Sequence, residues 1–76
     1  MVPFAERLKA ARIEKGLKQR EVAEYLQITV RSYQQYEGGV RRPNFEALAA
    51  LAIYLDVTTD YLLGLSDTPN QRGDSI

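Results

Sequence analysis

The sequence predicts an all-α domain of five short helices. Apolar residues recur at spacings of three and four in several segments, as on one buried helix face, and residues that cap or end helices separate these segments. The length of 76 residues, with 45% hydrophobic and 26% charged, is typical of one small soluble domain. We expect this domain to span residues 1–65. Residues 66–76 contain a single apolar residue and are expected to form a flexible tail or a linker.

The first helix is expected from Phe4 to Lys15. Apolar residues at spacings of four and three form its inward side: Phe4, Leu8 and Ala11. Charged residues are expected on its other faces: Glu6, Arg7, Lys9 and Arg12. Gly16 then supplies the left-handed conformation that commonly ends a helix.

A short second helix is expected from Gln19 to Leu26. Val22, Ala23 and Leu26 lie on one of its faces. A helix of this length is marginal alone, so it must be stabilised by packing against its neighbours.

A third helix is expected from Val30 to Glu37 after a three-residue break. Thr29 can cap it, because its hydroxyl can accept a hydrogen bond from a free amide of the first turn. The spacing of Tyr33 and Tyr36 favours core packing over base stacking. The outer face then carries no carboxylate before Glu37 and presents Val30, Arg31, Gln34 and Gln35.

The basic loop that follows, Gly38 to Pro43, leads to two more helices. Asn44 is expected to cap a fourth helix that extends to Asp56. The inward residues of this helix are expected to be Phe45, Leu48, Leu51, Ala52 and Leu55. Thr58 caps a last helix from Thr59 to Leu63, which Gly64 ends.

Composition argues against an enzyme. The chain has neither cysteine nor histidine, so the commonest general base and the usual zinc ligands are missing, and we expect no catalytic residue, cofactor or metal. The net charge is zero but unevenly distributed. Residues 1–45 hold nine Lys and Arg against five Asp and Glu, a balance of +4, whereas residues 46–76 hold one against five, a balance of −4. A basic first half of this kind is compatible with binding a polyanion.

The order of these features resembles the Cro and phage-repressor type of helix-turn-helix protein, the XRE family. The resemblance covers residues 4–65 and implies a five-helix, lambda-repressor-like DNA-binding domain. The matching residues are Leu8, Arg12, Gly16, Leu17, Gln19, Val22, Ala23, Leu26, Ile28, Thr29, Ser32, Tyr36, Glu37, Gly39, Pro43, Leu48, Ala52, Leu55, Val57, Leu62, Leu63 and Gly64.

The resemblance also implies residue roles. Base edges in the major groove are expected to be contacted by Val30, Arg31, Gln34 and Gln35. DNA phosphates are expected to be contacted by Lys18, Gln19, Gly38, Arg41 and Arg42. Arg12 and Glu37 are expected to form a structural ion pair. The alternative for the exposed residues is that they are simply solvated.

The sequence therefore predicts a cytoplasmic, sequence-specific transcriptional regulator, a repressor that binds a palindromic operator as a homodimer. Apolar residues expected at the dimer surface are Tyr54, Val57, Tyr61 and Leu65. The alternative is a protein-binding module of the same fold, an antitoxin or an adaptor, whose protein partner binds the C-terminal half. No apolar run approaches the roughly 20 residues of a membrane span, so no membrane partner is expected.

Overall fold

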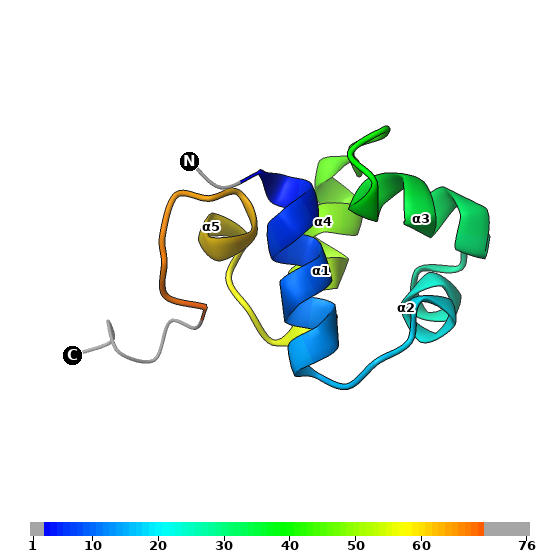
Figure 1. Cartoon of the computed structure of the whole chain (residues 1–76), viewed down its shortest axis with the longest axis horizontal. Helices are drawn as coiled ribbons and strands as arrows, with labels where there is room; N and C mark the ends of the chain where they lie inside the picture. The colour runs from blue at the N-terminus through cyan, green and yellow to red at the C-terminus, as the bar shows by residue number, and fades with distance from the viewer. Residues whose placement is uncertain (1–2, 70–76) are drawn as a thin grey trace.

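The computed structural model describes residues 3–69 and contains five α-helices and no strand over that range. The helices are α1 (Phe4–Glu14), α2 (Gln19–Leu26), α3 (Val30–Glu37), α4 (Phe45–Leu55) and α5 (Thr59–Leu62). The predicted all-α, five-helix fold is confirmed. In Figure 1, α2 and α3 lie at one end of the molecule and α5 at the other, with α1 and α4 between them.

The helix boundaries follow the predicted caps. Thr29, Asn44 and Thr58 each accept a hydrogen bond from the backbone amide three residues later, over 3.0, 2.8 and 2.9 Å. Gly16 has a φ of 70° after α1, as predicted. The turn between α2 and α3 has no glycine, and Gln27 adopts the left-handed conformation there with a φ of 60°. This conformation costs a residue with a side chain roughly 1–2 kcal/mol, which the surrounding packing must offset.

The core draws on all five helices. Its buried members are Leu8, Ala11, Val22, Ala23, Tyr33, Tyr36, Leu51, Ala52, Leu55 and Leu62. Tyr33 and Tyr36 pack edge to face, with ring centroids 6.2 Å apart, so their predicted place in the core is confirmed. Burying these two rings fixes the rotation of α3 about its axis and thereby determines which of its residues face outward.

Two side chains depart from the predicted pattern. Phe45 was expected in the core but is 80% exposed. A helical side chain leans toward the helix N-terminus, so the first residue of α4 projects past the start of the helix and beyond the core. Arg7 was expected on an outer face of α1 but is only 8% exposed, because α5 and the residues after it cover this side of α1.

The apolar surface also differs from the prediction. Tyr54, Val57 and Tyr61 are half-buried and pack against the core, whereas Leu65 alone among the expected residues is well exposed. Tyr54 stacks on Tyr25 of α2 with ring centroids 4.0 Å apart.

Candidate nucleic-acid interface

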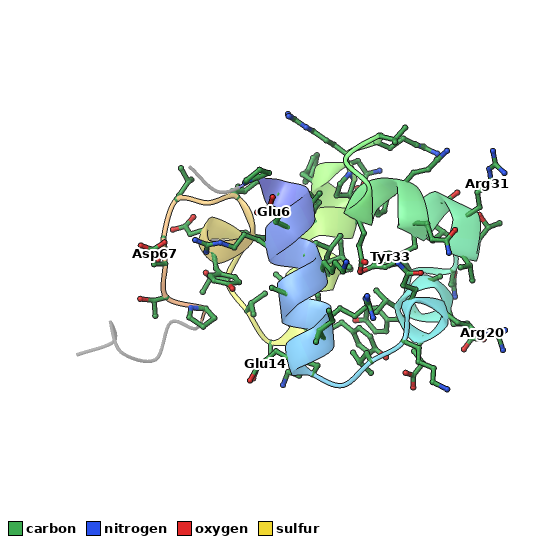
Figure 2. The ribbon with its side chains drawn as sticks, viewed as in Figure 1. Glu6, Glu14, Arg20, Arg31, Tyr33 and Asp67 are labelled. Carbon is green, nitrogen blue, oxygen red and sulfur yellow. The ribbon has the colours of Figure 1, made fainter. Side chains whose placement is uncertain are left out.

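The helices α2 and α3 form a two-helix unit with one face turned away from the rest of the protein. Figure 2 shows the side chains of Arg20 and Arg31 projecting from this unit at the end of the molecule farthest from Asp67. Arg31 is exposed and forms no ion pair within residues 3–69. The unit therefore presents cationic groups on an unobstructed surface.

The four residues expected at base edges differ in exposure. Arg31 and Gln34 are exposed, whereas Val30 and Gln35 are half-buried. Val30 packs partly against the core, so it has less free surface than an outward position implies. Because Arg31 and Gln34 are the more exposed of the four, the outer face of α3 is centred on them.

A chain of hydrogen bonds connects α2 with α3. The side-chain amide of Gln34 donates to the Gln19 side-chain oxygen over 3.2 Å, and Gln19 Nε2 donates to Glu37 Oε1 over 3.0 Å. Because a carboxylate can only accept, Glu37 sets the orientation of the Gln19 amide, which then presents its oxygen to Gln34. The residue expected at a phosphate is thus linked to a residue expected at a base.

The ion pair expected between Arg12 and Glu37 is present. Arg12 Nε donates to Glu37 Oε2 over 2.6 Å, and the Glu37 side chain is only 5% exposed. Arg12 also donates to the carbonyl of Leu17 over 2.8 Å, and the hydroxyl of Tyr33 donates to the same carboxylate oxygen as Arg12 Nε. α1, the start of α2 and the end of α3 therefore meet at one carboxylate.

These contacts shift the ionisation of all three partners. Burial alone would raise the pKa of Glu37, but hydrogen bonds from Arg12, Tyr33 and Gln19 outweigh it and lower that pKa. The hydrogen bond with Glu37 raises the pKa of Arg12. Burial, together with the hydrogen bond to the carboxylate, raises the pKa of Tyr33. The cluster is therefore a stable charged pair with a neutral phenol, a structural role rather than an acid–base site.

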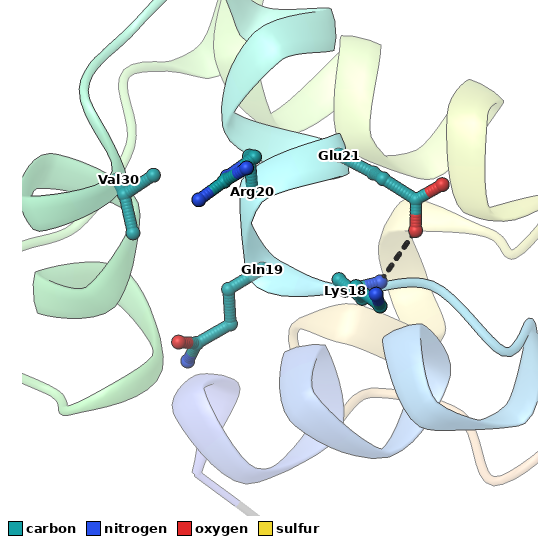
Figure 3. A pocket seen from close by; sticks show the side chains of 5 residues that line it. All are labelled: Lys18, Gln19, Arg20, Glu21 and Val30. Atoms are coloured by element: carbon teal, nitrogen blue, oxygen red, sulfur yellow. Dashed lines mark hydrogen bonds between the residues drawn. The ribbon is translucent and has the colours of Figure 1, made fainter.

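A shallow hollow lies between the first turns of α2 and α3. It is lined by Lys18, Gln19, Arg20, Glu21 and Val30 (Figure 3). The Glu21 carboxylate turns away to accept from the Lys18 backbone amide over 2.7 Å. The Arg20 side chain extends across the hollow toward Val30 (Figure 3). Cationic side chains and free helix amides together make this hollow suited to an anion.

Arg20 is the residue of this surface that sequence reasoning missed. Its position on α2, away from the buried Val22 and Ala23, indicates by itself only that it faces solvent. The sequence does place Arg20 directly after Gln19, in the first turn of α2. Side chains in the first turn lie at the N-terminal end of the helix, where a bound anion is favoured, and this could have identified Arg20.

Backbone amides of the loop after α3 donate hydrogen bonds to carbonyls of α3. Gly38 N donates to the Gln34 carbonyl over 2.8 Å, and the amides of Val40 and Arg41 donate to the Gln35 carbonyl over 3.0 and 3.2 Å. The amide hydrogen of Gly38 is therefore already bonded to the Gln34 carbonyl, and a phosphate could only share it. The side chains of Arg41 and Arg42 are exposed and available.

Among residues 3–69 there is no group of three side chains that could hold a metal ion. No helix in that part of the chain is long and apolar enough to cross a bilayer.

Comparison with known proteins identifies the family. A model of the helix-turn-helix family matches residues 8–62. The chain belongs to the XRE-type helix-turn-helix family. Members similar to this chain are transcriptional regulators rather than enzymes.

Three regulators of Bacillus subtilis (strain 168) are similar to this chain. The SPbeta prophage-derived uncharacterized HTH-type transcriptional regulator YonR is 43% identical over 60 residues, 79% of this chain and 56% of the relative. AnsR is 44% identical over 59 residues, 78% of this chain and 51% of its own length. ImmR is 42% identical over 69 residues, 91% and 54% of the two chains. The chain thus spans about half the length of these relatives.

Solved structures agree with the family assignment. The P22 c2 repressor protein, solved in complex with a synthetic operator, superposes with a TM-score of 0.79 at 27% identity over 87% of this chain and all of that one. A transcriptional regulator from Listeria innocua gives a TM-score of 0.75 at 38% identity, over 80% of this chain and 57% of that one. These neighbours support the predicted repressor-like fold.

Proposed function

We propose that this helix-turn-helix domain binds duplex DNA and regulates transcription, with α3 in the major groove. The observation that carries the proposal is the outer face of α2 and α3, where Arg20 and Arg31 project from the surface (Figure 2) and Gln34 is exposed. A major groove about 12 Å wide admits one helix. The operator complex of the P22 c2 repressor provides a precedent on a similar fold.

Within this proposal, Arg31 and Gln34 make the main base contacts, and Val30 and Gln35 contribute at the edges of the helix. Arginine can donate two hydrogen bonds to guanine, and glutamine can both donate to and accept from adenine. Each good bidentate pair contributes roughly 1–3 kcal/mol of discrimination. Lys18, Gln19, Arg41 and Arg42 contact phosphates on either side of α3.

We further propose a repressor that acts in the cytoplasm and binds a palindromic operator as a homodimer. One two-turn helix contacts few base pairs, and two copies at half-sites about one helical turn apart would multiply its specificity. The exposed apolar residues Phe45, Ala49 and Ile53 recur every four residues along α4 and supply a surface for a second copy.

The first experiment is selection of bound sites from a random duplex pool, followed by titration at several salt concentrations. Enrichment of a palindrome, with loss of preference at one base position in Arg31→Ala, supports the base-contact assignment. Weak binding that is blind to sequence in the wild type would contradict it. Lys9→Ala, which removes an exposed cation from α1, is the matched control and should leave the preferred sequence unchanged.

A second candidate function is a protein-binding module. The observation that favours it is the same exposed α4 surface, which belongs almost entirely to the acidic second half of the chain, residues 46–76, with a charge balance of −4. Such a module would bind its protein partner through α4 and would show DNA affinity that barely changes with salt, whereas phosphate contacts weaken steeply with salt.

A further inference from the structure

Arg7 is a buried cation held by residues much later in the chain. Its Nη1 donates to the carbonyls of Tyr61 and Ser66 over 3.1 and 2.9 Å, and its Nη2 donates to the Asp67 carboxylate over 2.8 Å. Its guanidinium carbon lies 4.2 Å from the centroid of the Tyr61 ring. A buried charge needs such partners, and here most of them come from α5 and the residues after it.

We call residues Ser66–Pro69 the strap. Arg7 binds its first two residues, and its last residue is bound separately, because the amide of Thr58 donates to the Pro69 carbonyl over 2.9 Å. The Thr68 amide donates to the Ser66 hydroxyl and makes a turn within the strap. The strap is thus attached at both ends, to α1 and to the residue that caps α5.

The ionic contact that holds the strap is asymmetric. The Arg7 side chain is 9% exposed, whereas that of Asp67 is 98% exposed. The carbonyl bonds to Arg7 lie in protected surroundings, but the carboxylate faces solvent, where salt and competing anions weaken an ion pair. Specific hydrogen bonds therefore hold the strap on Arg7, but at Asp67 other anions can compete for the guanidinium.

The strap lies away from the DNA-facing surface. In Figure 1 the segment after α5 lies on the opposite side of α1 from α2 and α3, and in Figure 2 Asp67 and Arg31 lie at opposite ends of the molecule. Release of the strap consequently leaves the contacts of α3 in place.

We propose that the strap is an intramolecular docking segment, bound reversibly by Arg7 and Thr58. The folded domain then includes Ser66–Pro69, which lie beyond the boundary at residue 65 expected from the sequence. A partner that supplies a carboxylate or phosphate in place of Asp67 would compete for Arg7 and release the strap without touching α3. This proposal does not depend on DNA binding.

Amide hydrogen exchange of the whole chain tests the proposal, because the Thr58 amide has no helical partner and reports directly on the strap. Asp67→Asn removes the charge from the strap and should speed exchange of the Thr58 amide by roughly threefold to fivefold. The Tyr33 amide, which donates to the Thr29 carbonyl at the start of α3, should keep its wild-type rate. High salt should mimic the variant in the wild type.

Glu6→Gln is the matched control, since it neutralises an exposed carboxylate on α1 beside Arg7 that makes no hydrogen bond among the described residues. It should leave exchange of Thr58 unchanged. Equal Thr58 rates in the wild type and Asp67→Asn would overturn the proposal. Arg7→Met gives a second check: a folded variant in which Thr58 stays protected would show that Arg7 does not hold the strap. DNA affinity should be the same in wild type and Asp67→Asn.

Discussion

Arg12 on α1 pairs with Glu37 at the last position of α3, with 2.6 Å between Nε and Oε2. The two residues are 25 positions apart in sequence, so the pair ties α3 to α1. The same carboxylate accepts from Gln19, which makes it the point through which α1, α2 and α3 are aligned.

Arg12→Ala should destabilise the domain. It leaves the Glu37 carboxylate nearly buried without its cation, and the expected loss in free energy of unfolding is about 3 kcal/mol. For a chain of this size that lowers Tm by roughly 10 °C or more. Thermal unfolding followed by circular dichroism measures the change. Lys9→Ala, an exposed cation on the same helix, should unfold near the wild-type temperature, and an equal loss in both variants would contradict the prediction.

The stability should fall in acid through Glu37. Its pKa in the folded state lies below the ordinary value of 4.5, so the folded protein keeps this carboxylate ionised to a lower pH than the unfolded chain does. Its contribution is therefore complete above about pH 4.5 and is lost as the pH falls through the lower folded pKa. Denaturant unfolding between neutral pH and pH 3 should show a smaller pH dependence in Glu37→Gln. An unchanged pH dependence would exclude Glu37 as the titrating group.

Arg20→Ala should reduce the salt dependence of DNA binding. If Arg20 neutralises one phosphate, its loss lowers the slope of log affinity against log salt by about 0.9. Preference among bases should stay the same, in contrast to Arg31→Ala. Fluorescence anisotropy with one labelled duplex at several salt concentrations gives the slope. If Arg20→Ala gave the same slope as the wild type, the Arg20 side chain would not contact a phosphate.

Phe45→Ser should weaken association between two copies on DNA. The ring is 80% exposed, so its loss should barely change folding but should remove apolar area from the α4 surface. Binding to an operator with two half-sites should become less cooperative, while binding to a single half-site is unchanged. Leu65→Ser is the control, because Leu65 is 65% exposed but lies in the turn after α5 rather than on α4. Equal loss of cooperativity in both variants would count against α4 as the contact.

Local features of the fold could be predicted from the sequence. The bounds of α2 and α3 agree with the prediction because Thr29 caps α3 and the spacing of Val22, Ala23, Tyr33 and Tyr36 identifies the buried faces. The predicted first, fourth and last helices each end one residue earlier in the structure, at Glu14, Leu55 and Leu62. Helix ends fray, and a boundary is less sharply encoded than a buried face.

Features that depend on distant contacts could not be predicted. Arg7 looks like a solvated residue of α1, and its burial comes from partners 54 to 60 positions later. The bond between Gln34 and Gln19 depends on how α3 crosses α2, which periodicity does not reveal. For the candidate site, the residue types on the outer face of α3 could therefore be predicted from the sequence. The hydrogen bond between Gln34 of this face and Gln19 of α2 is seen only in the structure.

The opposed positions of Arg31 and Asp67 have a consequence for the encounter with DNA. The exposed side chains of Arg20 and Arg31 stand at one end of the molecule, and Asp67 stands at the other (Figure 2). These two arginines belong to the basic first half of the chain, with a charge balance of +4, and cations on an exposed surface attract a polyanion at a distance. If the domain binds DNA through this surface, these cations would favour encounters in which α3 faces the duplex, and low ionic strength would speed association even though the chain carries no net charge.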